Sequence, residues 1–291
     1  MGNPNGSLSI NDAAGDSTFL FLSTLLHQRL YVEWNQGLDM SVFHHPDRNW
    51  ACRIQSDILL KGLKTVVMEN ELLRISILAD KGADIYEFLH KPTDTDFMWR
   101  TPVGLHNPAT FTPTNTTSEG PFMDHYEGGW QEIFPSGGTD NTHAGVSYGL
   151  HGEVCQLPWS FKVIEDTPDR ISCLFSTRTL RTPFLIERTL TLNKGEAKLH
   201  ISETLKNLSP ESFDFSWGHH LAFGEPFLDE YCRVDSGAKG IEIHDQAYSD
   251  NQRFETVAKF DYPITRDKSG LQVYIRNIPP ISAKTLTFTY L

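Results

Sequence analysis

Residues 171–223 alternate apolar and polar side chains with a period of two, and this pattern restricts the fold more than any other feature. Four segments, ISCLFSTRTL, FLIERTLTL, AKLHISETL and SFDFSWGHHLAF, are separated by the turn sequences RTP, NKGE and KNLSPES. In the second segment, Ile186, Leu190 and Leu192 fall in one phase and threonines fall in the other. Alternation over several strands without a long helical period predicts an all-β fold, a large antiparallel β-sandwich.

The first half of the chain contains a hairpin-like stretch and then a long region of loop character. TVVMENELLRISILAD (65–80) has two apolar runs around Glu69-Asn70-Glu71, and ADIYEFLH follows as another strand. Residues 100–150 are rich in Gly, Pro, Thr and Asn, which predicts loops. Long loops inside a domain are uncommon unless they are functional or disordered. We favour a functional region, because it carries Trp130, Glu132 and His143 and His151 follows it directly.

The chain divides into three parts on composition and periodicity. Residues 1–17 are rich in Gly, Asn, Ser and Asp, which predicts a disordered N-terminus. Residues 18–55 have no clear period and form a poorly defined N-terminal extension, and residues 56–291 form the β-sandwich domain. The last segment, KTLTFTYL, alternates like a half-buried strand up to its final residue. We therefore expect a domain that is truncated at its C-terminus.

Charge and cysteine content exclude several classes of function. The net charge is -12, which argues against nucleic-acid partners and anionic membrane surfaces, since both require clustered Lys and Arg. The four cysteines, Cys52, Cys155, Cys173 and Cys232, form no C-x-x-C pair. Neither a zinc site nor a redox motif is predicted, and scattered thiols are typical of a reducing compartment.

One short apolar segment near the N-terminus is the candidate for a targeting or membrane signal. FLFLSTLL (19–26) is too short to span a bilayer, and Asp12 and Asp16 precede it where a signal peptide needs positive charge. The sequence thus predicts a cytoplasmic protein with no membrane contact. It does not predict the oligomeric state.

Two short motifs in the loop-rich region suit sugar recognition. Trp130-Gln131-Glu132 joins an indole, which packs on the C–H face of a sugar, to a carboxylate that accepts hydroxyl hydrogen bonds. In His151-Gly152, the glycine lets the backbone approach a ligand closely. Each motif has a structural alternative. The tryptophan would cover the core, and His151 would begin a strand with its ring hydrogen-bonded to backbone.

The adjacent His219 and His220 lie in SWGHHLAFG, an apolar segment of strand character. Neighbouring side chains on a strand point to opposite faces, so the two rings cannot both bind one metal ion. No Asp or Glu lies at metal-ligand spacing to them, and no phosphate-loop, dinucleotide or G-x-S-x-G motif is present. We therefore predict no metal and no cofactor. Two purely structural histidines are the alternative.

Four ordered stretches carry a resemblance to a known superfamily. They are TVVMENELLRISILADKGADIYEFLHKPTDTDFMWRTP, EGGWQEIFPSGG, HGEVCQLPW, and ERTLTLNKGEAKLHISETLKNLS continuing into WGHHLAFG. Together they resemble the aldose 1-epimerase, or galactose mutarotase-like, superfamily, and most of all its DUF4432 branch. The resemblance implies a β-sandwich with a sugar cleft on its concave sheet. It also implies an isomerase that interconverts sugar anomers by acid/base ring opening without a cofactor.

The resemblance also implies roles for individual residues. His220 matches the family's proton donor, the acid that protonates the ring oxygen of a monosaccharide or sugar derivative. That role requires a nearby carboxylate to raise its pKa from about 6.5. The substrate-binding candidates are His151, which matches a sugar-contacting HG motif, Arg100 in MWRTP, Trp130 and Glu132 in the loop that shapes the cleft, and His219 in a supporting position.

One departure from the family pattern keeps other functions open. The family's base is a Glu near the C-terminus, and nothing after Thr285 in this chain is acidic. Either the base is missing or another residue such as Glu132 replaces it. A non-catalytic carbohydrate-binding protein is therefore the main alternative. A polysaccharide lyase or hydrolase and a structural module without a ligand are weaker ones, and the identity of the sugar stays open.

Overall fold

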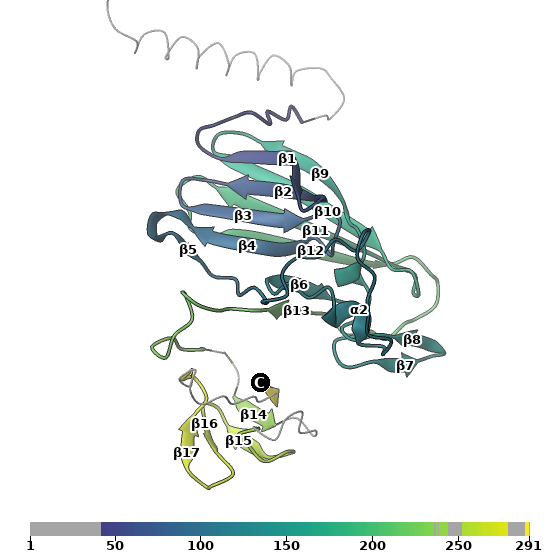
Figure 1. The fold of residues 1–291 in the computed structure, drawn as a ribbon, viewed down its shortest axis with the longest axis vertical. Coiled ribbons are helices and arrows are strands. Elements are labelled where there is room, and N and C mark those ends of the chain that lie inside the picture. Colours follow the sequence, from purple (N-terminus) through teal and green to yellow (C-terminus); the bar gives the residue numbers. More distant parts are fainter. Residues whose placement is uncertain (1–41, 236, 238, 244–251, 279–288, 291) are drawn as a thin grey trace, which may run out of the picture.

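A computed structural model describes residues 42–235, 237, 239–243, 252–278 and 289–290 of the 291-residue chain. Two antiparallel β-sheets pack face to face in it (Figure 1), which confirms the predicted all-β sandwich. The N-terminal segment predicted to be disordered lies outside the described residues. So does most of the C-terminal segment predicted as a strand. No helix among the described residues is long and apolar enough to cross a membrane.

The larger sheet contains seven strands in the order β1-β2-β3-β4-β6-β13, with β5 beside β4. Its central hairpin, β2–β3, is the one predicted between residues 65 and 80, with Thr65 opposite Leu78 and Glu69 opposite Arg74. The strands are β1 (Arg53–Leu60), β2 (Leu63–Glu69), β3 (Leu73–Leu78), β4 (Asp84–His90), β5 (Thr95–Asp96), β6 (Trp130–Ile133) and β13 (Gly218–Leu221).

Asn70 forms the turn of this hairpin and ties it to the second sheet. Its side-chain oxygen accepts hydrogen bonds from the backbone N–H groups of Leu72 and Leu73, at 2.9 and 2.7 Å. Its amide nitrogen donates to the carbonyl oxygens of Asn193 and Glu196, at 2.7 and 2.8 Å. The side chain is fully buried, so all its hydrogen-bonding capacity is used within the protein.

The smaller sheet contains four strands in the order β12-β11-β10-β9. They are β9 (Ser160–Asp166), β10 (Arg170–Arg178), β11 (Phe184–Asn193) and β12 (Leu199–Asn207). Three of the four segments predicted from alternation, residues 171–207, are β10, β11 and β12 in consecutive antiparallel pairing. The fourth, SFDFSWGHHLAF, crosses to the larger sheet, where its residues 218–221 pair with β6.

The core lies between the two sheets and follows the predicted phases. Ile75 and Ile77 come from the larger sheet and meet Phe175, Leu190 and Leu192 from the smaller one, all fully buried. Each buried side chain of this size contributes about 1.5–3 kcal/mol from removal of apolar surface from water. The alternation read from the sequence is therefore the division between core and surface.

The region predicted as loops contains short elements and one strand, β6, of the larger sheet. It includes the short helix α2 (Gly120–Met123) and the hairpin of β7 (Asn141–His143) and β8 (Val146–Tyr148). The 3-10 turns η1 (Lys91–Thr93) and η2 (Val154–Gln156) flank it. Gly128 and Gly129, with φ of 87° and 74°, precede β6, and a side chain on Gly128 would overlap the Trp99 carbonyl. These glycines allow the chain to enter the sheet beside β4.

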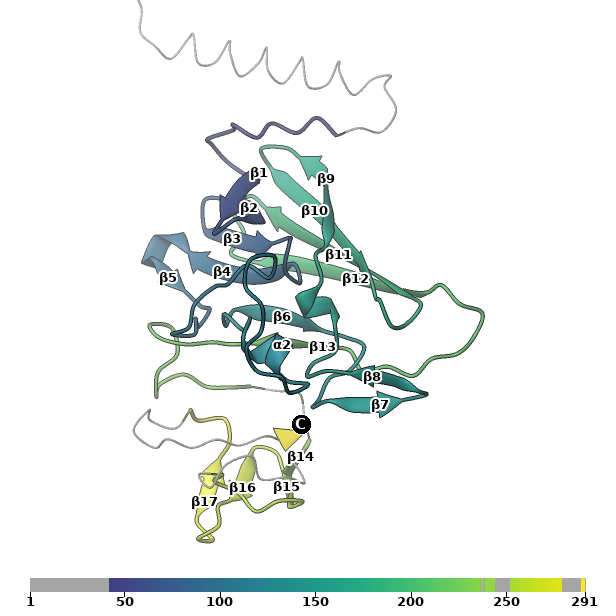
Figure 2. The same cartoon turned by 45° about the vertical axis from the view of Figure 1, so that its right-hand side comes forward.

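The described residues from 233 onwards form a smaller unit with its own core. It contains β14 (Gly240–Ile243), β15 (Lys259–Asp261), β16 (Ile264–Arg266), β17 (Gln272–Tyr274) and β18 (Thr289–Tyr290). Ile241, Ile243, Phe254 and Val273 are buried together there. In Figures 1 and 2 this unit lies beyond β13, outside the two-sheet sandwich. The two-sheet sandwich itself runs from β1 to β13.

Phe175 provides a test of the inter-sheet core. Phe175→Ala should lower the free energy of unfolding by about 3–5 kcal/mol, because it leaves a cavity between the sheets. Urea denaturation followed by tryptophan fluorescence measures the change. Ile164→Ala, at a position that is 37% exposed on the neighbouring β9, is the matched control and should stay within about 0.5 kcal/mol of wild type. Equal losses in the two variants would contradict this position for the core.

Candidate functional site

The pairing of β6 with β13 places four polar side chains on two opposite faces. Glu132 lies opposite His219, and Gln131 lies opposite His220. Because side chains alternate along a strand, Glu132 and His219 face the smaller sheet, whereas Gln131 and His220 face away from it. The two adjacent histidines therefore belong to two different groups of side chains. We call these the outer histidine pair, His151 with His220, and the inter-sheet cluster, Glu132, Arg188, Glu203, Trp217 and His219.

In the outer histidine pair, two rings from distant parts of the chain lie side by side. The centroids of the His151 and His220 rings are 5.0 Å apart. Phe122 from α2 has its ring edge-on to both, at 4.7 Å from His151 and 6.0 Å from His220. The Tyr126 ring lies 5.3 Å from His220. The helix α2, which carries Phe122, lies next to β6 and β13 in Figure 2.

His151 is held by an unusual backbone. It has a φ of 62° and is followed by Gly152, with a φ of 78°. Gly152 forms a bridge with Phe134, and a side chain at this glycine would overlap the Phe134 carbonyl. The close approach predicted for this glycine is therefore made to the end of β6. It fixes His151 next to the strand that carries Gln131.

Both outer histidines are neutral at pH 7. Burial, together with the neighbouring His151, lowers the pKa of His220 to about 4. Burial also lowers the pKa of His151, although its hydrogen bond with the Gly137 carbonyl oxygen opposes this. The polar partner of His220 is Gln131, whose Oε1 is 3.3 Å from Nδ1. A proton donor role for His220 would require a nearby carboxylate. Among the described contacts of this ring, the polar partner is an uncharged amide.

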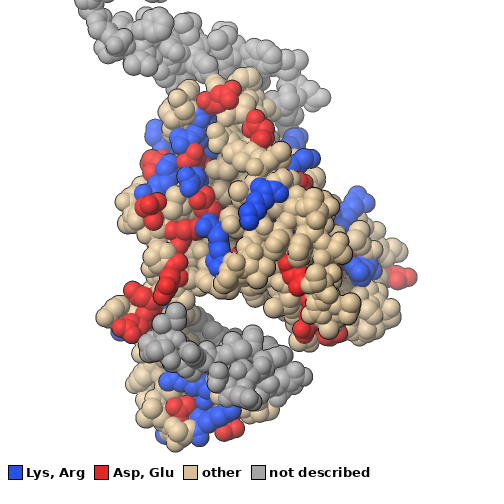
Figure 3. All heavy atoms as spheres, viewed as in Figure 1, with Lys and Arg blue, Asp and Glu red and all other residues tan. Residues whose placement is uncertain are grey.

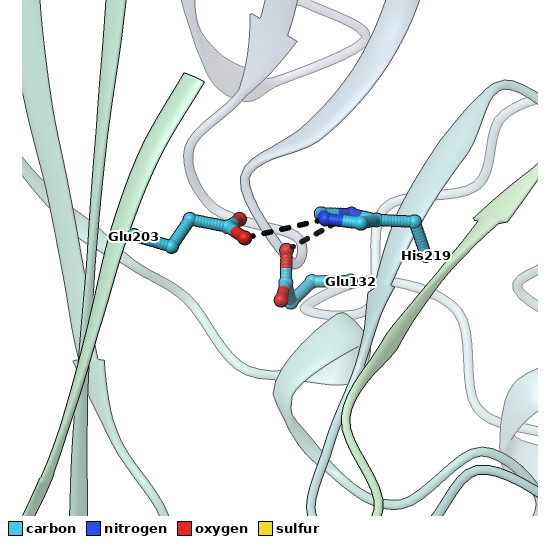
Figure 4. A group of neighbouring side chains, drawn as sticks. All are labelled: Glu132, Glu203 and His219. Carbon is cyan, nitrogen blue, oxygen red and sulfur yellow. Dashed lines mark ion pairs between the residues drawn. The ribbon is translucent and has the colours of Figure 1, made fainter.

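The inter-sheet cluster joins the two sheets at the end of the core (Figure 4). Glu132 Oε2 is 3.2 Å from Arg188 Nη1 on β11 and 3.4 Å from His219 Nδ1. Glu203 on β12 reaches His219 Nε2 at 3.2 Å. The Trp217 indole N–H donates to the other oxygen of Glu132. Arg188 and Glu132 are each only 1% exposed, so this ion pair is part of the sandwich interior.

Burial, neighbouring charges and hydrogen bonds all shift the pKa values of the inter-sheet cluster. Burial raises the pKa of Glu132 to about 7, against the attraction of Arg188 and with the support of Glu203. Although burial opposes it, hydrogen bonds with His219 and Glu132 lower the pKa of Glu203. The hydrogen bond with Glu203 raises the pKa of His219. The Trp130 indole N–H, which donates to His219 Nδ1 at 3.0 Å, favours the neutral ring instead.

Three atoms of this cluster have the spacing of metal ligands. One atom each from Glu132, Glu203 and His219 lies within 4.8 Å of the others. No Asp or Glu lies at metal-ligand spacing to the histidines in the sequence, because Glu132 and Glu203 reach His219 from other strands. Arg188 already neutralises Glu132, and Trp130 occupies Nδ1 of His219. The donor set therefore fits an ion-pair network between the sheets better than it fits a cation.

A third buried group lies behind the outer histidine pair. Lys81 Nζ is 2.6 Å from both Asp84 Oδ2 and Glu127 Oε2, and all three side chains are almost fully buried. Against the effect of burial, the two carboxylates raise the pKa of Lys81. Burial raises the pKa of Asp84 well above its ordinary value. Glu127 Oε1 is 3.4 Å from Gln131 Nε2, which connects this group to His220 through one side chain.

A family model described as a domain of unknown function, DUF4432, matches residues 60–273. This chain belongs to the DUF4432 family. The DUF4432 resemblance stated from the sequence is thereby confirmed. A comparison with curated proteins gave no match.

Two solved structures are similar to this DUF4432 chain at low identity. A galactose mutarotase-like protein from Clostridium acetobutylicum is 16% identical, with a TM-score of 0.44, over 76% of this chain and 63% of its own. A protein from Escherichia coli K12, titled "Putative aldose 1-epimerase", is 15% identical, with a TM-score of 0.42, over 64% and 59%. The DUF4432 chain spans less than two thirds of the length of either structure.

The structure brings some of the residues predicted for the site together and separates others. His151 and His220 meet at the outer face, but Glu132 and His219 point to the opposite side of the sheet. Glu132 therefore does not face His220 and cannot serve as its catalytic partner. Trp130 lies in β6 instead of a loop, and it packs partly against the core. This outcome favours the structural alternative for the Trp130 motif.

Arg100 lies among paired charges of the larger sheet. Figure 3 shows basic and acidic side chains interspersed over β1–β5. There Arg100 donates to Asp96, and its guanidinium carbon lies 4.4 Å from the centroid of the Tyr86 ring. Arg74 pairs in the same way with Glu87, at 2.7 Å. These contacts hold Arg100 against β4 and β5.

The sequence did not predict several residues of the outer histidine pair's surroundings and of the inter-sheet cluster. Gln131 and Phe122 carry no pattern that singles them out. Arg188 and Glu203 do carry one, since each falls in the apolar phase of its strand, between Ile186 and Leu190 for Arg188. A charged residue in a buried phase requires a partner from the facing sheet. That signal predicts an inter-sheet ion pair, although it does not name the partner.

Glu132 provides a test of the inter-sheet cluster through pH. Its pKa rises from 4.5 to about 7 on folding, so the proton it keeps stabilises the folded state at low pH. This contribution should be lost as the pH rises from about 4.5 to about 7. The stability difference between wild type and Glu132→Gln, from urea denaturation, should therefore change across that window. The exposed Glu211→Gln is the control, and a difference independent of pH would contradict the raised pKa.

Proposed function

We propose that this protein binds a monosaccharide or sugar derivative at the outer histidine pair and interconverts its anomers, as an isomerase of the aldose 1-epimerase type. The observation that carries the proposal is the contact between the His151 and His220 rings, beside the aromatic rings of Phe122 and Tyr126. The superfamily resemblance had assigned the same two histidines to the sugar. The DUF4432 match itself assigns no substrate.

The chemistry of the pair suits a neutral hydroxylated ligand. Each Nδ1 has a partner within the protein, Gln131 for His220 and the Gly137 carbonyl for His151. A neutral imidazole has one donor and one acceptor nitrogen, so each ring keeps Nε2 available for a hydroxyl group. Aromatic rings beside such groups provide apolar surface for the C–H faces of a sugar. Because both imidazoles are uncharged, they offer no selective attraction to a phosphate or carboxylate group.

A non-catalytic carbohydrate-binding protein is the second candidate, and one observation favours it. Among the described contacts of His220 there is no carboxylate, and its pKa is lowered to about 4. A general acid and a general base each contribute roughly 10²–10⁴-fold to a rate. A site with two weakly basic rings and no charged partner would bind the sugar without accelerating its mutarotation.

His151→Asn and His220→Asn separate the two candidates. Calorimetric titration with D-galactose and D-glucose should show binding to wild type and loss of at least about tenfold in affinity in either variant. Polarimetry on the α anomers should show acceleration by wild type and a loss of roughly 10²-fold in His220→Asn. His143→Asn, an exposed histidine on β7, makes the same chemical change elsewhere and should leave both measurements unchanged.

The outcomes distinguish the candidates clearly. Binding with no acceleration in wild type would support the non-catalytic candidate. Absence of binding to either hexose and to a panel of neutral monosaccharides would overturn both. Full activity in His220→Asn would remove this residue from the reaction.

The pH dependence of binding gives an independent test. Because His220 keeps its neutral form down to about pH 4, affinity for a neutral sugar should be constant between about pH 8 and pH 5.5. Protonation of the ring below that range should weaken binding by removing the acceptor. Titrations at four pH values measure this. A midpoint near 6.5, the ordinary value for histidine, would contradict the lowered pKa.

A further inference from the structure

We propose that Gln131 is a positioning residue that holds His220 as the Nδ1–H tautomer, so that Nε2 faces the substrate as a proton acceptor. The inference rests on the proposed function, in which His220 contacts the sugar. It assigns His220 a starting role as base, where the superfamily resemblance assigns a proton donor. The argument depends on how three neighbouring side chains satisfy their hydrogen bonds.

The orientation of the Gln131 amide is fixed by its partners. The side chain is fully buried, and its Nε2 donates to the Gly128 carbonyl oxygen and lies 3.4 Å from Glu127 Oε1. Both partners are acceptors only, so both amide hydrogens are used there. The remaining atom, Oε1, is the one that lies 3.3 Å from His220 Nδ1. An amide oxygen cannot donate, and therefore Nδ1 must carry the proton.

Glu127, which contacts the Gln131 amide, is itself held in place by an ion pair. Its side chain is fully buried and its Oε2 is 2.6 Å from Lys81 Nζ, which also binds Asp84. A flipped Gln131 amide would point its oxygen at the Glu127 carboxylate and the Gly128 carbonyl. Buried acceptors would then face one another with no hydrogen between them, which is costly in a site without water contact. The ion-paired group thus holds Gln131, and Gln131 holds the ring.

The other groups that face His220 do not favour a proton on its Nε2. His151 is a neutral ring, and Phe122 has no titratable group. Burial raises the pKa of Tyr126 to about 12, so its hydroxyl stays neutral. Nε2 of His220 therefore keeps its lone pair at neutral pH.

His219 provides an internal reference with the opposite tautomer. The Trp130 indole can only donate, and its Nε1 is 3.0 Å from His219 Nδ1. The proton of neutral His219 must then lie on Nε2, 3.2 Å from Glu203 Oε2. At a pH above the raised pKa of His219, the two adjacent histidines on β13 are thus expected to show opposite tautomers in the same spectrum.

This tautomer allows one residue to carry out both proton transfers of the ring opening. Nε2 of His220 accepts the proton of the anomeric hydroxyl, the hydroxyl oxygen forms a carbonyl with C1, and the bond from C1 to the ring oxygen breaks. The resulting imidazolium gives the same proton to the ring oxygen. Rotation about C1–C2 and the reverse steps close the ring on the other face. A lowered pKa makes the imidazolium a strong donor in the second step.

The tautomer can be measured on the full chain without any ligand. Long-range ¹H–¹⁵N correlation spectra of ¹⁵N-histidine-labelled protein, with His219→Asn and His220→Asn for assignment, should show Nδ1–H for His220 and Nε2–H for His219. Gln131→Met should shift His220 towards Nε2–H, the tautomer that free histidine side chains prefer. Gln131→Glu should keep Nδ1–H, because the oxygen that replaces Nε2 faces Glu127 and the Gly128 carbonyl and carries the carboxyl proton, which leaves the other oxygen as an acceptor for the ring. Gln55→Met on β1 is the control and should change neither tautomer.

An Nε2–H tautomer for His220 in wild type would overturn the inference, as would an unchanged tautomer in Gln131→Met. If Gln131→Met does not fold, the wild-type spectrum and the nearly isosteric Gln131→Glu still decide it. The proposed function fails separately. If the tautomers are as expected but His220→Asn binds sugars like wild type, Gln131 positions His220 but the ring does not serve the sugar.

Discussion

The pairing of β6 with β13 is the contact on which both polar groups of this protein depend. Its register sets Glu132 opposite His219 and Gln131 opposite His220, so a single two-strand ladder supplies the inter-sheet cluster and the outer histidine pair. A slip of one residue would exchange the faces and bring Gln131 into the core and Glu132 beside His151. The buried ion pair of Glu132 with Arg188 disfavours that slip, because displacement of Glu132 would leave Arg188 buried without its partner.

The two faces give chemically identical rings opposite properties. On the inner face, His219 lies between two carboxylates and keeps its proton on Nε2, towards Glu203. On the outer face, burial and the uncharged Gln131 leave His220 neutral, with its proton on Nδ1. Sequence position alone cannot explain this difference, since the residues are adjacent. It follows from the partners on each face, which are Glu132 and Glu203 for His219 and Gln131 for His220.

Alternation predicted much of the sandwich and little of the site. The strands of residues 65–80 and 171–207 have long periodic runs, so their phases and the core residues Ile186, Leu190 and Leu192 follow directly from the sequence. β6 has only four residues, with Gly129 directly before it and Pro135 two residues after it, so the surrounding sequence resembles a loop. Because β13 also has only four residues, its alternation did not indicate that it pairs with the larger sheet. Site residues depend on these short strands, and so the sequence could pair His151 with His220 only through a family resemblance.

The inter-sheet cluster and the outer histidine pair are coupled through their shared backbone. Arg188, Glu132 and Trp217 fix β6 from the inside, while Glu127 and Lys81 fix Gln131 from the outside. A buried ion pair contributes little net stability, because desolvation offsets most of the attraction. Its effect here is to leave β6 only one favourable position between the sheets. The orientation of His220 towards a ligand thus depends on charges that never contact that ligand.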